Sequence, residues 1–171
     1  MVKRVIAIGG EPATGKTTLV REFKSNYPTA PFKFGQVRGE YNKESNLYFI
    51  GVFDGSIFEG TDKLSMSVQP DFIKFLNWCE GVVIYEGDRL FNQSLFTLEY
   101  PFIKVVLTAE EDTLRRRHNL RGDSQTDTFL KSKRTKINNI MTNNTDIIVL
   151  KSETPRYELV EVLKNLLRDV E

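Results

Sequence analysis

Short apolar runs alternate with amphipathic segments along this chain. The runs at residues 5–8, 82–85, 102–107 and 146–150 are rich in β-branched and other apolar residues, which is typical of strands buried on both faces. Apolar residues recur at helical spacing in residues 16–25, 69–80 and 155–170. Thr154 followed by Pro155 is a typical start for the last of these helices. Strands that alternate with helices predict a parallel sheet in one α/β domain spanning residues 1–171.

The stretch between the first two predicted helices has a different pattern. Residues 32–41 and 47–53 are aromatic-rich extended segments with a polar turn between them. Residues 54–66 carry two glycines and show no apolar period, and a long loop of this kind inside a compact domain is usually functional. The phenylalanines of the following helix, together with Trp78 at its end, are expected in the core.

Composition and charge argue against several classes of protein. Among 171 residues, 24 basic and 23 acidic side chains give a net charge of +1. That total argues against a uniformly basic nucleic-acid binder but leaves room for a local basic patch. We expect no membrane span, because no apolar run approaches the roughly 20 residues that a span needs. We also expect no signal peptide, because residues 1–8 run straight into glycines without a long apolar region or a cleavage site. Cys79 is the only cysteine, which excludes an intramolecular disulfide and favours the reducing cytoplasm.

The most specific motif follows the first predicted strand. Residues 10–17 are Gly-Glu-Pro-Ala-Thr-Gly-Lys-Thr and fit the pattern G-x-x-x-x-G-K-[ST]. Its glycines let successive backbone N–H groups point into one concavity, which the N-terminus of the next helix extends. Lys16 can then reach the β- and γ-phosphates of a nucleoside triphosphate, and the Thr17 hydroxyl can bind Mg²⁺. The predicted nucleotide-binding residues are Gly10, Ala13, Thr14, Gly15, Lys16, Thr17 and Thr18.

On this motif and its strand–helix setting, the chain resembles the P-loop NTPase superfamily, and its small size points to the P-loop kinases. The resemblance implies a three-layer sandwich with a five-stranded parallel sheet at its centre. It also implies ATP as the phosphoryl donor and Mg²⁺ as the cofactor.

Two carboxylates and an arginine follow the second buried strand. Glu86, Asp88 and Arg89 stand beyond its carboxyl end, where ligands bind in open α/β sheets. We expect Glu86 or Asp88 to face the metal, directly or through a water, and Asp88 with Arg89 to hold the acceptor. The segment resembles the acidic-then-arginine segment after the third strand of nucleoside kinases. The alternative is a solvated acidic turn in which Arg89 is paired with a neighbour.

The long loop holds the candidates for the catalytic base. A kinase that phosphorylates a hydroxyl benefits from a carboxylate that accepts the hydroxyl proton. Asp54 and Asp62 are the candidates, and Asp54 is favoured because it directly follows an extended segment. Phe53 is expected to stack on a base of the acceptor. The alternative is an ordinary surface loop with an Asp-Gly turn.

Basic residues are concentrated in one segment. Between Arg115 and Lys136 there are eight basic and two acidic residues, a net charge of +6, while the rest of the chain carries −5. This segment follows the strand at residues 102–107, as the mobile lid does in P-loop kinases. We therefore expect a helical, arginine-rich lid at about residues 110–142, with a break between its helices near residues 120–123.

Lid arginines cover the triphosphate and neutralise charge that develops during phosphoryl transfer. Arg117, Arg121 and Arg134 are the candidates for this role. The same positive charge can also hold a nucleic-acid backbone. A solvated basic helix face is the simplest alternative.

The segment from residue 53 to residue 70 also resembles kinases encoded in bacteriophage genomes. Some of these phosphorylate 5-hydroxymethyluracil already built into DNA, as a step toward hypermodified thymine. With the P-loop and residues 86–89, this resemblance covers roughly a third of the chain. It implies an acceptor in double-stranded DNA and action in the cytoplasm of an infected host.

Other functions stay open on the sequence. A nucleoside or nucleotide monophosphate kinase, or another small-molecule P-loop kinase, needs no polymer. A non-kinase NTPase of the guanine-reading switch type needs Asn-Lys-x-Asp, whereas Asn42-Lys43 is followed by Glu44-Ser45. A motor ATPase usually needs a longer chain for its oligomer interface. A nucleic-acid-binding module with a vestigial P-loop would leave the intact Lys16-Thr17 pair unexplained.

Overall fold

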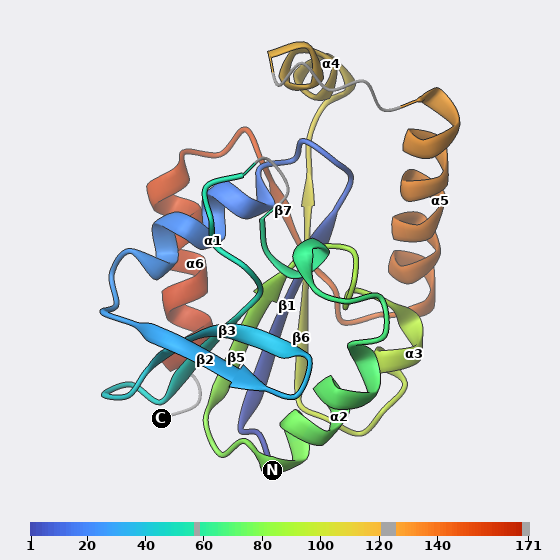
Figure 1. Ribbon diagram of the computed structural model, residues 1–171. Helices are drawn as coiled ribbons and strands as arrows, with labels where there is room; N and C mark the ends of the chain where they lie inside the picture. The colour runs from blue at the N-terminus through green and yellow to red at the C-terminus, as the bar shows by residue number, and fades with distance from the viewer. Residues whose placement is uncertain (57–58, 121–125, 169–171) are drawn as a thin grey trace.

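Seven strands form one sheet in this computed structural model, which describes residues 1–56, 59–120 and 126–168 (Figure 1). The sheet order is β2-β3-β4-β5-β1-β6-β7. The strands are β1 (Arg4–Gly10), β2 (Ala30–Phe34), β3 (Val37–Asn42), β4 (Leu47–Ile50), β5 (Val82–Glu86), β6 (Phe102–Thr108) and β7 (Ile148–Lys151). The five strands from β4 to β7 in this order are parallel, as the resemblance implies, and β2 and β3 extend them as an antiparallel hairpin.

The hairpin corrects one prediction. Residues 32–41, expected as a single extended segment, are divided by a turn in which Phe34 pairs directly with Val37. Gly35 makes this tight turn with a φ of +57°, a conformation that favours glycine. The Gln36 N–H donates to Asp71 Oδ2 at 2.8 Å, which ties the turn to a helix on one face of the sheet.

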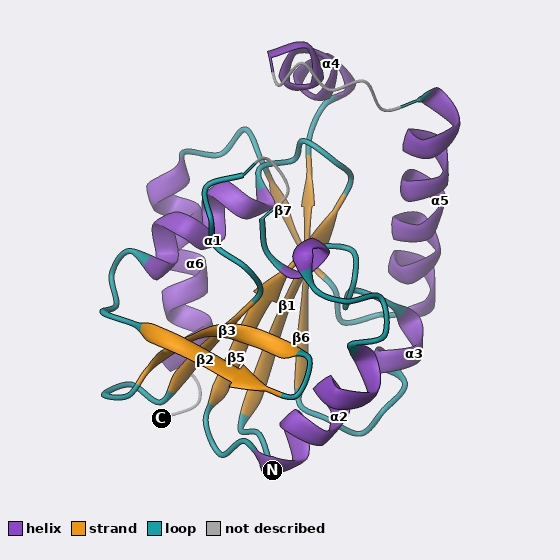
Figure 2. Cartoon of the chain, viewed as in Figure 1, coloured by secondary structure: helices purple, strands orange, loops and turns teal. Residues whose placement is uncertain are grey.

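Helices cover both faces of the sheet and make a three-layer sandwich (Figure 2). One face carries α1 (Lys16–Lys24) and α6 (Arg156–Arg168); the other carries α2 (Gln69–Trp78), α3 (Gln93–Phe96) and α5 (Asp127–Asn143). Side chains alternate along β1, as they must in a strand. Ile6 and Ile8 pack toward α1 and α6, whereas Val5 and Ala7 belong to the core on the opposite face. Both faces of the central strands are therefore buried.

Two features of the helices differ from the sequence-based expectation. The short helix α3 was not predicted; the side chain of Asn92 caps it by accepting from the Leu95 N–H at 3.0 Å. Trp78 was expected in the core but is 55% exposed. It is the last residue of α2, and its ring lies over Phe32 and Phe34 of the hairpin at the rim of the core.

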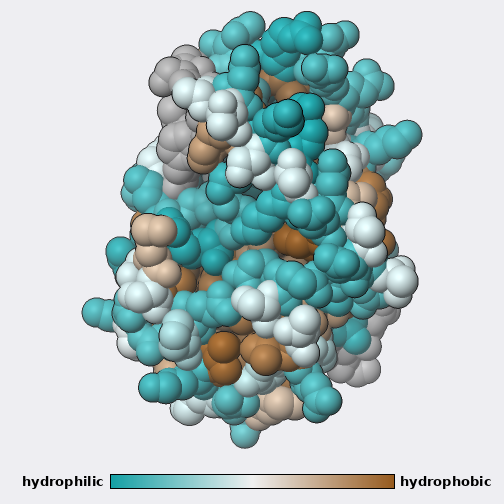
Figure 3. Space-filling view, turned by 90° about the vertical axis from the view of Figure 1, so that its right-hand side faces the viewer, coloured by the Kyte–Doolittle hydropathy of each residue, from teal (hydrophilic) through white to brown (hydrophobic). Residues whose placement is uncertain are grey.

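The surface over α2, α3 and α5 is mostly hydrophilic, with hydrophobic groups in small separate areas (Figure 3). Within residues 1–56, 59–120 and 126–168, no helix combines the length and the apolar character needed to cross a membrane.

The parallel register determines where the site lies. Ile8 of β1 is level with Glu86 of β5, and Gly10 is level with Leu107 of β6. The loops that follow β1, β4 and β5 therefore leave the sheet at the same edge. The helix α4 (Glu111–Leu120), which begins the predicted lid region, lies beyond this edge (Figure 1).

Candidate active site

The P-loop occupies the turn from β1 into α1, as predicted. Its backbone takes left-handed conformations at Ala13 and Gly15, with φ values of +68° and +89°. Gly10 cannot be replaced without a clash, because an added Cβ would lie 2.5 Å from the Leu107 carbonyl oxygen. Lys16 Nζ donates to the carbonyl oxygens of Gly10 at 2.8 Å and Glu11 at 3.1 Å. The lysine thus bends back over the loop where phosphates bind in this motif.

Glu86 meets the P-loop at the end of β5. The Thr17 hydroxyl donates to Glu86 Oε1 at 2.9 Å, and Glu86 is only 2% exposed. Burial raises the pKa of Glu86 to about 7, against the opposing effects of Lys16 and the Thr17 hydrogen bond. Nearby Asp62 and Glu59 raise this pKa further by charge repulsion. A carboxyl group with this pKa changes its protonation state near neutral pH.

The donors of this pair suit Mg²⁺. Magnesium in phosphoryl-transfer sites is usually bound by one or two protein oxygen ligands together with substrate phosphates and water. Thr17 and Glu86 supply a hydroxyl and a carboxylate of this kind. Within the described residues, no group of three or more His, Cys, Asp and Glu could hold a metal.

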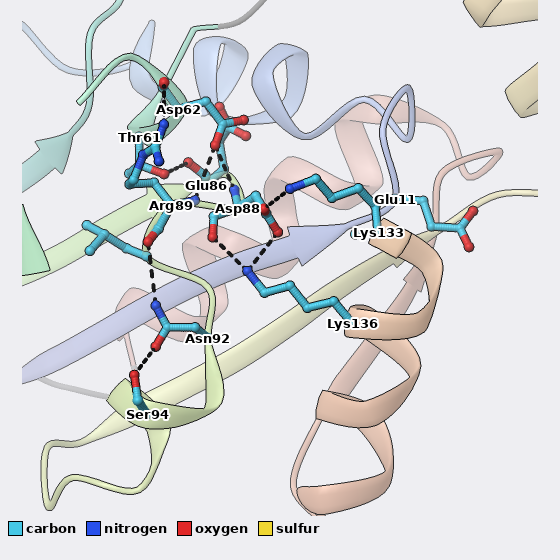
Figure 4. Close-up of polar contacts among 12 residues, drawn as sticks. Glu11, Thr61, Asp62, Glu86, Asp88, Arg89, Asn92, Ser94, Lys133 and Lys136 are labelled. Atoms are coloured by element: carbon cyan, nitrogen blue, oxygen red, sulfur yellow. Dashed lines mark hydrogen bonds and ion pairs between the residues drawn. The ribbon is translucent and has the colours of Figure 1, made fainter. Parts of the chain in front are cut away.

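Asp62 is anchored directly beside this pair. It lies in a short 3₁₀ helix, Thr61–Lys63. Its Oδ1 accepts hydrogen bonds from the backbone N–H groups of Asp88 at 2.9 Å and Arg89 at 3.2 Å (Figure 4). Thr61 donates to the Glu86 carbonyl oxygen at 2.9 Å. These bonds bring the middle of the long loop against the end of β5.

Asp88 is held by the lid helix. Lys133 and Lys136 of α5 both form ion pairs with its carboxylate, and Lys136 Nζ also donates to the Asp88 carbonyl oxygen at 3.0 Å (Figure 4). Burial acts to raise the pKa of Asp88, but the hydrogen bonds from the two lysines outweigh it and the pKa is lowered. Asp88 therefore stays ionised and ties α5 to the strand end.

The predicted lid arginines differ in how the structure positions them. Arg117 Nη1 donates to the Ala13 carbonyl oxygen at 3.1 Å and to Ser152 Oγ at 2.6 Å. Arg134 Nε donates to Glu11 Oε1 at 2.8 Å. Both side chains thus reach the P-loop, one from each lid helix. Arg121 lies outside the described residues, within the break expected between α4 and α5.

One cavity of about 690 Å³ joins most of these groups. Of the predicted site residues it is lined by Gly10, Ala13, Gly15, Lys16, Thr17, Thr18, Asp62, Glu86, Asp88, Arg89 and Arg117. Thr14 is buried inside the loop, where its hydroxyl donates to the Glu11 carbonyl oxygen at 2.8 Å. The sequence therefore identified the P-loop, the strand end and one lid arginine of a shared cavity.

Phe53 and Asp54 do not line the cavity. Phe53 packs at the edge of the core between β4 and α1, with Lys24 Nζ 5.0 Å from its ring centre. Asp54 is exposed, and its Oδ1 accepts from the Ser56 N–H at 3.0 Å. Hydrogen bonds from Ser56 lower the pKa of Asp54. This is the Asp-Gly turn chemistry that was the alternative on the sequence.

Several lining residues were not singled out from the sequence. They include Arg21, Ser56, Glu59, Lys133 and Arg156. Arg21 and Arg156 lie on helices that were predicted from the spacing of their apolar residues, and this spacing does not indicate which polar residues face the site. Glu59 precedes Gly60 in the long loop, and that glycine was the one available signal. An added Cβ on Gly60 would lie 2.0 Å from Glu86 Oε1.

Comparisons with known proteins were made on the whole chain. No family model and no curated protein sequence matches it. It is similar to the solved structure of a gluconokinase from Sinorhizobium meliloti 1021, with a TM-score of 0.53, 14% sequence identity and coverage of 98% of this chain and 95% of that chain. An uncharacterized protein from Eubacterium ventriosum ATCC 27560 has a TM-score of 0.46, 14% identity and coverage of 98% and 99%, a likeness too distant to support an argument.

At this level of identity, the likeness to the gluconokinase concerns the fold alone. The chain has the α/β fold of the P-loop kinases.

Proposed function

We propose that the protein is an ATP-dependent kinase that transfers the γ-phosphoryl group to a hydroxyl. The observation that carries this proposal is the contact between Thr17 and Glu86 at the mouth of a P-loop that holds Lys16. A non-kinase NTPase would use the same three groups. The cavity, however, extends from them to Asp62 and Arg89, which gives space for a second substrate beside the nucleotide.

Each residue has a definite task in this proposal. Lys16 and the N-terminus of α1 bind the β- and γ-phosphates, while Thr17 and Glu86 hold Mg²⁺, which neutralises phosphate charge when bound. The acceptor oxygen forms a bond to the γ-phosphorus as the bond to the β–γ bridging oxygen breaks and ADP leaves. Asp62 accepts the proton of the acceptor hydroxyl, and Arg89 binds the acceptor. Arg117, Arg134 and Arg121 balance the charge that develops on the transferred group.

We propose 5-hydroxymethyluracil in DNA as one acceptor. The support is the resemblance of the P-loop, the loop after β4 and residues 86–89 to phage kinases that act on this base. The net charge of +6 between Arg115 and Lys136 also suits a polyanion. DNA binding through this segment would be sensitive to salt.

A small-molecule acceptor is the second candidate, and a specific observation favours it. Much of the lid charge is directed inward: Arg117 and Arg134 bind the P-loop, and Lys133 and Lys136 bind Asp88. Arg115 pairs with Glu111 and Asp112 on its own helix. A kinase with gluconate as its acceptor would be of this class, and gluconokinase is the name of the protein with the similar fold.

Labelled ATP with a panel of acceptors tests both candidates. The panel contains DNA with and without 5-hydroxymethyluracil, free nucleosides and nucleotides, and gluconate. Label on a panel member, lost in Lys16→Ala and kept in the exposed Lys33→Ala control, is the expected result. Release of labelled phosphate with no labelled acceptor would favour a non-kinase NTPase. Full transfer activity in Lys16→Ala would contradict the proposal.

A further inference from the structure

Glu59 is a buried carboxylate at the cavity that the proposed mechanism does not use. Its side chain is 1% exposed, and the residue lines the cavity with Arg21 and Asp62. Arg21 Nη2 donates to Glu59 Oε1 at 2.6 Å. The other oxygen, Oε2, is buried and has no hydrogen-bond partner among the described residues. A carboxylate left half satisfied in a protein interior is costly and calls for a functional explanation.

The position of Glu59 is determined by its neighbours on the chain. Gly60 and Val52 exchange two backbone hydrogen bonds, at 2.9 and 3.0 Å, which close the loop beneath the end of β4. Thr61 and Asp62 are bonded to the end of β5 through the Glu86 carbonyl oxygen and the N–H groups that follow it. These hydrogen bonds place Glu59 beside the groups that we assign to the reaction.

A second unpartnered atom belongs to Arg89, another residue that lines this cavity. Arg89 Nε is buried and has no hydrogen-bond partner within the described part of the chain. Glu59 Oε2 lacks a hydrogen-bond donor and Arg89 Nε lacks an acceptor. A ligand that carries both a donor and an acceptor would satisfy the two atoms. Arg21, with a side chain that is 51% exposed, has room to shift when a ligand approaches Glu59.

We infer that Glu59 determines the specificity of the acceptor subsite by accepting a hydrogen bond from an N–H or O–H group other than the hydroxyl that is phosphorylated. Arg89 donates to a carbonyl or acidic oxygen of the same molecule. The ligand class is a compact acceptor with a donor and an acceptor beyond the reacting hydroxyl. A uracil ring, through its imide edge, and a polyhydroxylated acid both have this chemistry. The inference rests on the proposed function in one respect: the ligand that Glu59 binds is taken to be the phosphoryl acceptor.

The inference is tested by comparing ligands with and without the hydrogen-bond donor, using the full-length protein. Binding is measured by calorimetry in the presence of Mg²⁺ and a non-hydrolysable ATP analogue. The probes are 5-hydroxymethyl-2′-deoxyuridine with its N3-methyl derivative, and a sugar acid with its deoxy derivatives. Loss of the donor is expected to weaken binding to the wild-type protein on the order of 10- to 100-fold, as for a hydrogen bond to a charged group. The pair of probes that responds identifies the source of the chemistry.

The same probes are then applied to Glu59→Gln. Its affinity for the intact probe is expected to fall by a similar factor, and removal of the donor should then change little, because the interaction is already weakened. Arg21→Gln breaks the same ion pair but keeps the carboxylate. Glu40→Gln makes the same chemical change on β3, in an ion pair with Lys24 away from the cavity. Neither is expected to abolish the preference for the intact probe.

Three outcomes would overturn the inference: no probe binds, donor deletion leaves wild-type affinity unchanged, or Glu59→Gln keeps the full preference. The melting temperature shows whether Glu59→Gln folds. If it does not fold, the comparison of intact and donor-deleted probes on the wild-type protein still tests the inference. Binding requires no phosphoryl transfer. Selective binding without labelled product would therefore reject the kinase proposal alone, and transfer with unchanged acceptor KM in Glu59→Gln would reject this inference alone.

Discussion

The Thr17 hydroxyl donates a hydrogen bond to Glu86 Oε1 at 2.9 Å, although 69 residues separate the two along the chain. They meet because β1 and β5 are parallel neighbours, with Ile8 level with Glu86. The P-loop therefore begins beside the last residue of β5. This contact joins a phosphate-binding loop to a carboxyl group whose pKa is raised to about 7 by burial.

The first prediction concerns pH and stability. Burial raises the pKa of Glu86 from 4.5 to about 7, so the folded protein binds this proton more tightly than the unfolded chain. The resulting stabilisation is fully present below about pH 4.5 and is lost as the pH rises through 7, by roughly 3 kcal/mol in all. Urea unfolding between pH 5 and pH 8 should show a smaller loss in Glu86→Gln than in the wild type. Parallel pH profiles would contradict the prediction.

Mg²⁺ binding should show the opposite trend with pH. A proton on Glu86 competes with the metal, so the affinity for Mg²⁺ with ATP is expected to fall as the pH drops below 7. Calorimetric titration at several pH values measures this, and Glu40→Gln is the control. The hypothesis of a metal-binding Glu86 fails if the Glu86→Gln variant binds Mg²⁺ and ATP as well as the wild type.

The two candidate bases can be separated by matched substitutions. Asp62 lines the cavity and is held by two backbone N–H groups, whereas Asp54 is exposed in a turn. We expect Asp62→Asn to lower kcat by about 10²- to 10⁴-fold, the usual contribution of a general base. Asp54→Asn should leave kcat within a factor of about two. A larger loss of kcat in Asp54→Asn than in Asp62→Asn would instead favour Asp54 as the catalytic base.

Arg117 is predicted to act on the transferred phosphoryl group. Its guanidinium already lies at the P-loop, 3.1 Å from the Ala13 carbonyl oxygen. Arg117→Gln should lower kcat by about 10²- to 10³-fold, as loss of one charge-stabilising donor does. Arg115→Gln changes an exposed arginine on the same helix, which pairs only locally with Glu111 and Asp112 in the described contacts. Equal effects of the two substitutions would indicate a general effect of lid charge.

Gly60 and Gly55 provide a test of close packing at the strand end. Both have positive φ values, +83° and +81°, but an added Cβ meets Glu86 Oε1 at 2.0 Å at Gly60 and nothing within 4 Å at Gly55. Gly55→Ala should cost only backbone strain of about 1–2 kcal/mol in the free energy of unfolding. Gly60→Ala should cost more and also weaken Mg²⁺ and ATP binding, since it displaces Glu86. Urea unfolding and nucleotide titration measure both effects.

Much of the fold of this protein could be predicted from its sequence, because the P-loop motif and the apolar patterns of its strands and helices are local. The G-x-x-x-x-G-K-[ST] pattern depends on backbone conformations that few residues adopt, and apolar runs of β5 and β6 need no partner to be recognised. The same holds for α1 and α2, and the helices α4 and α5 lie in the region that the sequence predicts to be helical. The hairpin of β2 and β3 was not predicted, because its two-residue turn at Gly35 lies within an aromatic-rich segment that was expected to be one strand.

Only the tertiary structure decided which polar residues share the cavity. The sequence favoured Asp54 over Asp62 as the base, whereas Asp62 lies at the cavity. The hydrogen bonds that Asp62 accepts from the backbone after β5 span 26 and 27 residues. Glu59 carries no motif, and its burial against Arg21 depends on packing between the loop and α1. The sequence predicted a lid for the +6 segment, with a solvated basic helix face as the alternative. Contacts with Glu11, Ala13 and Asp88 direct its charge inward, because long-range pairing of charges follows from strand order and cannot be inferred from spacing along the chain.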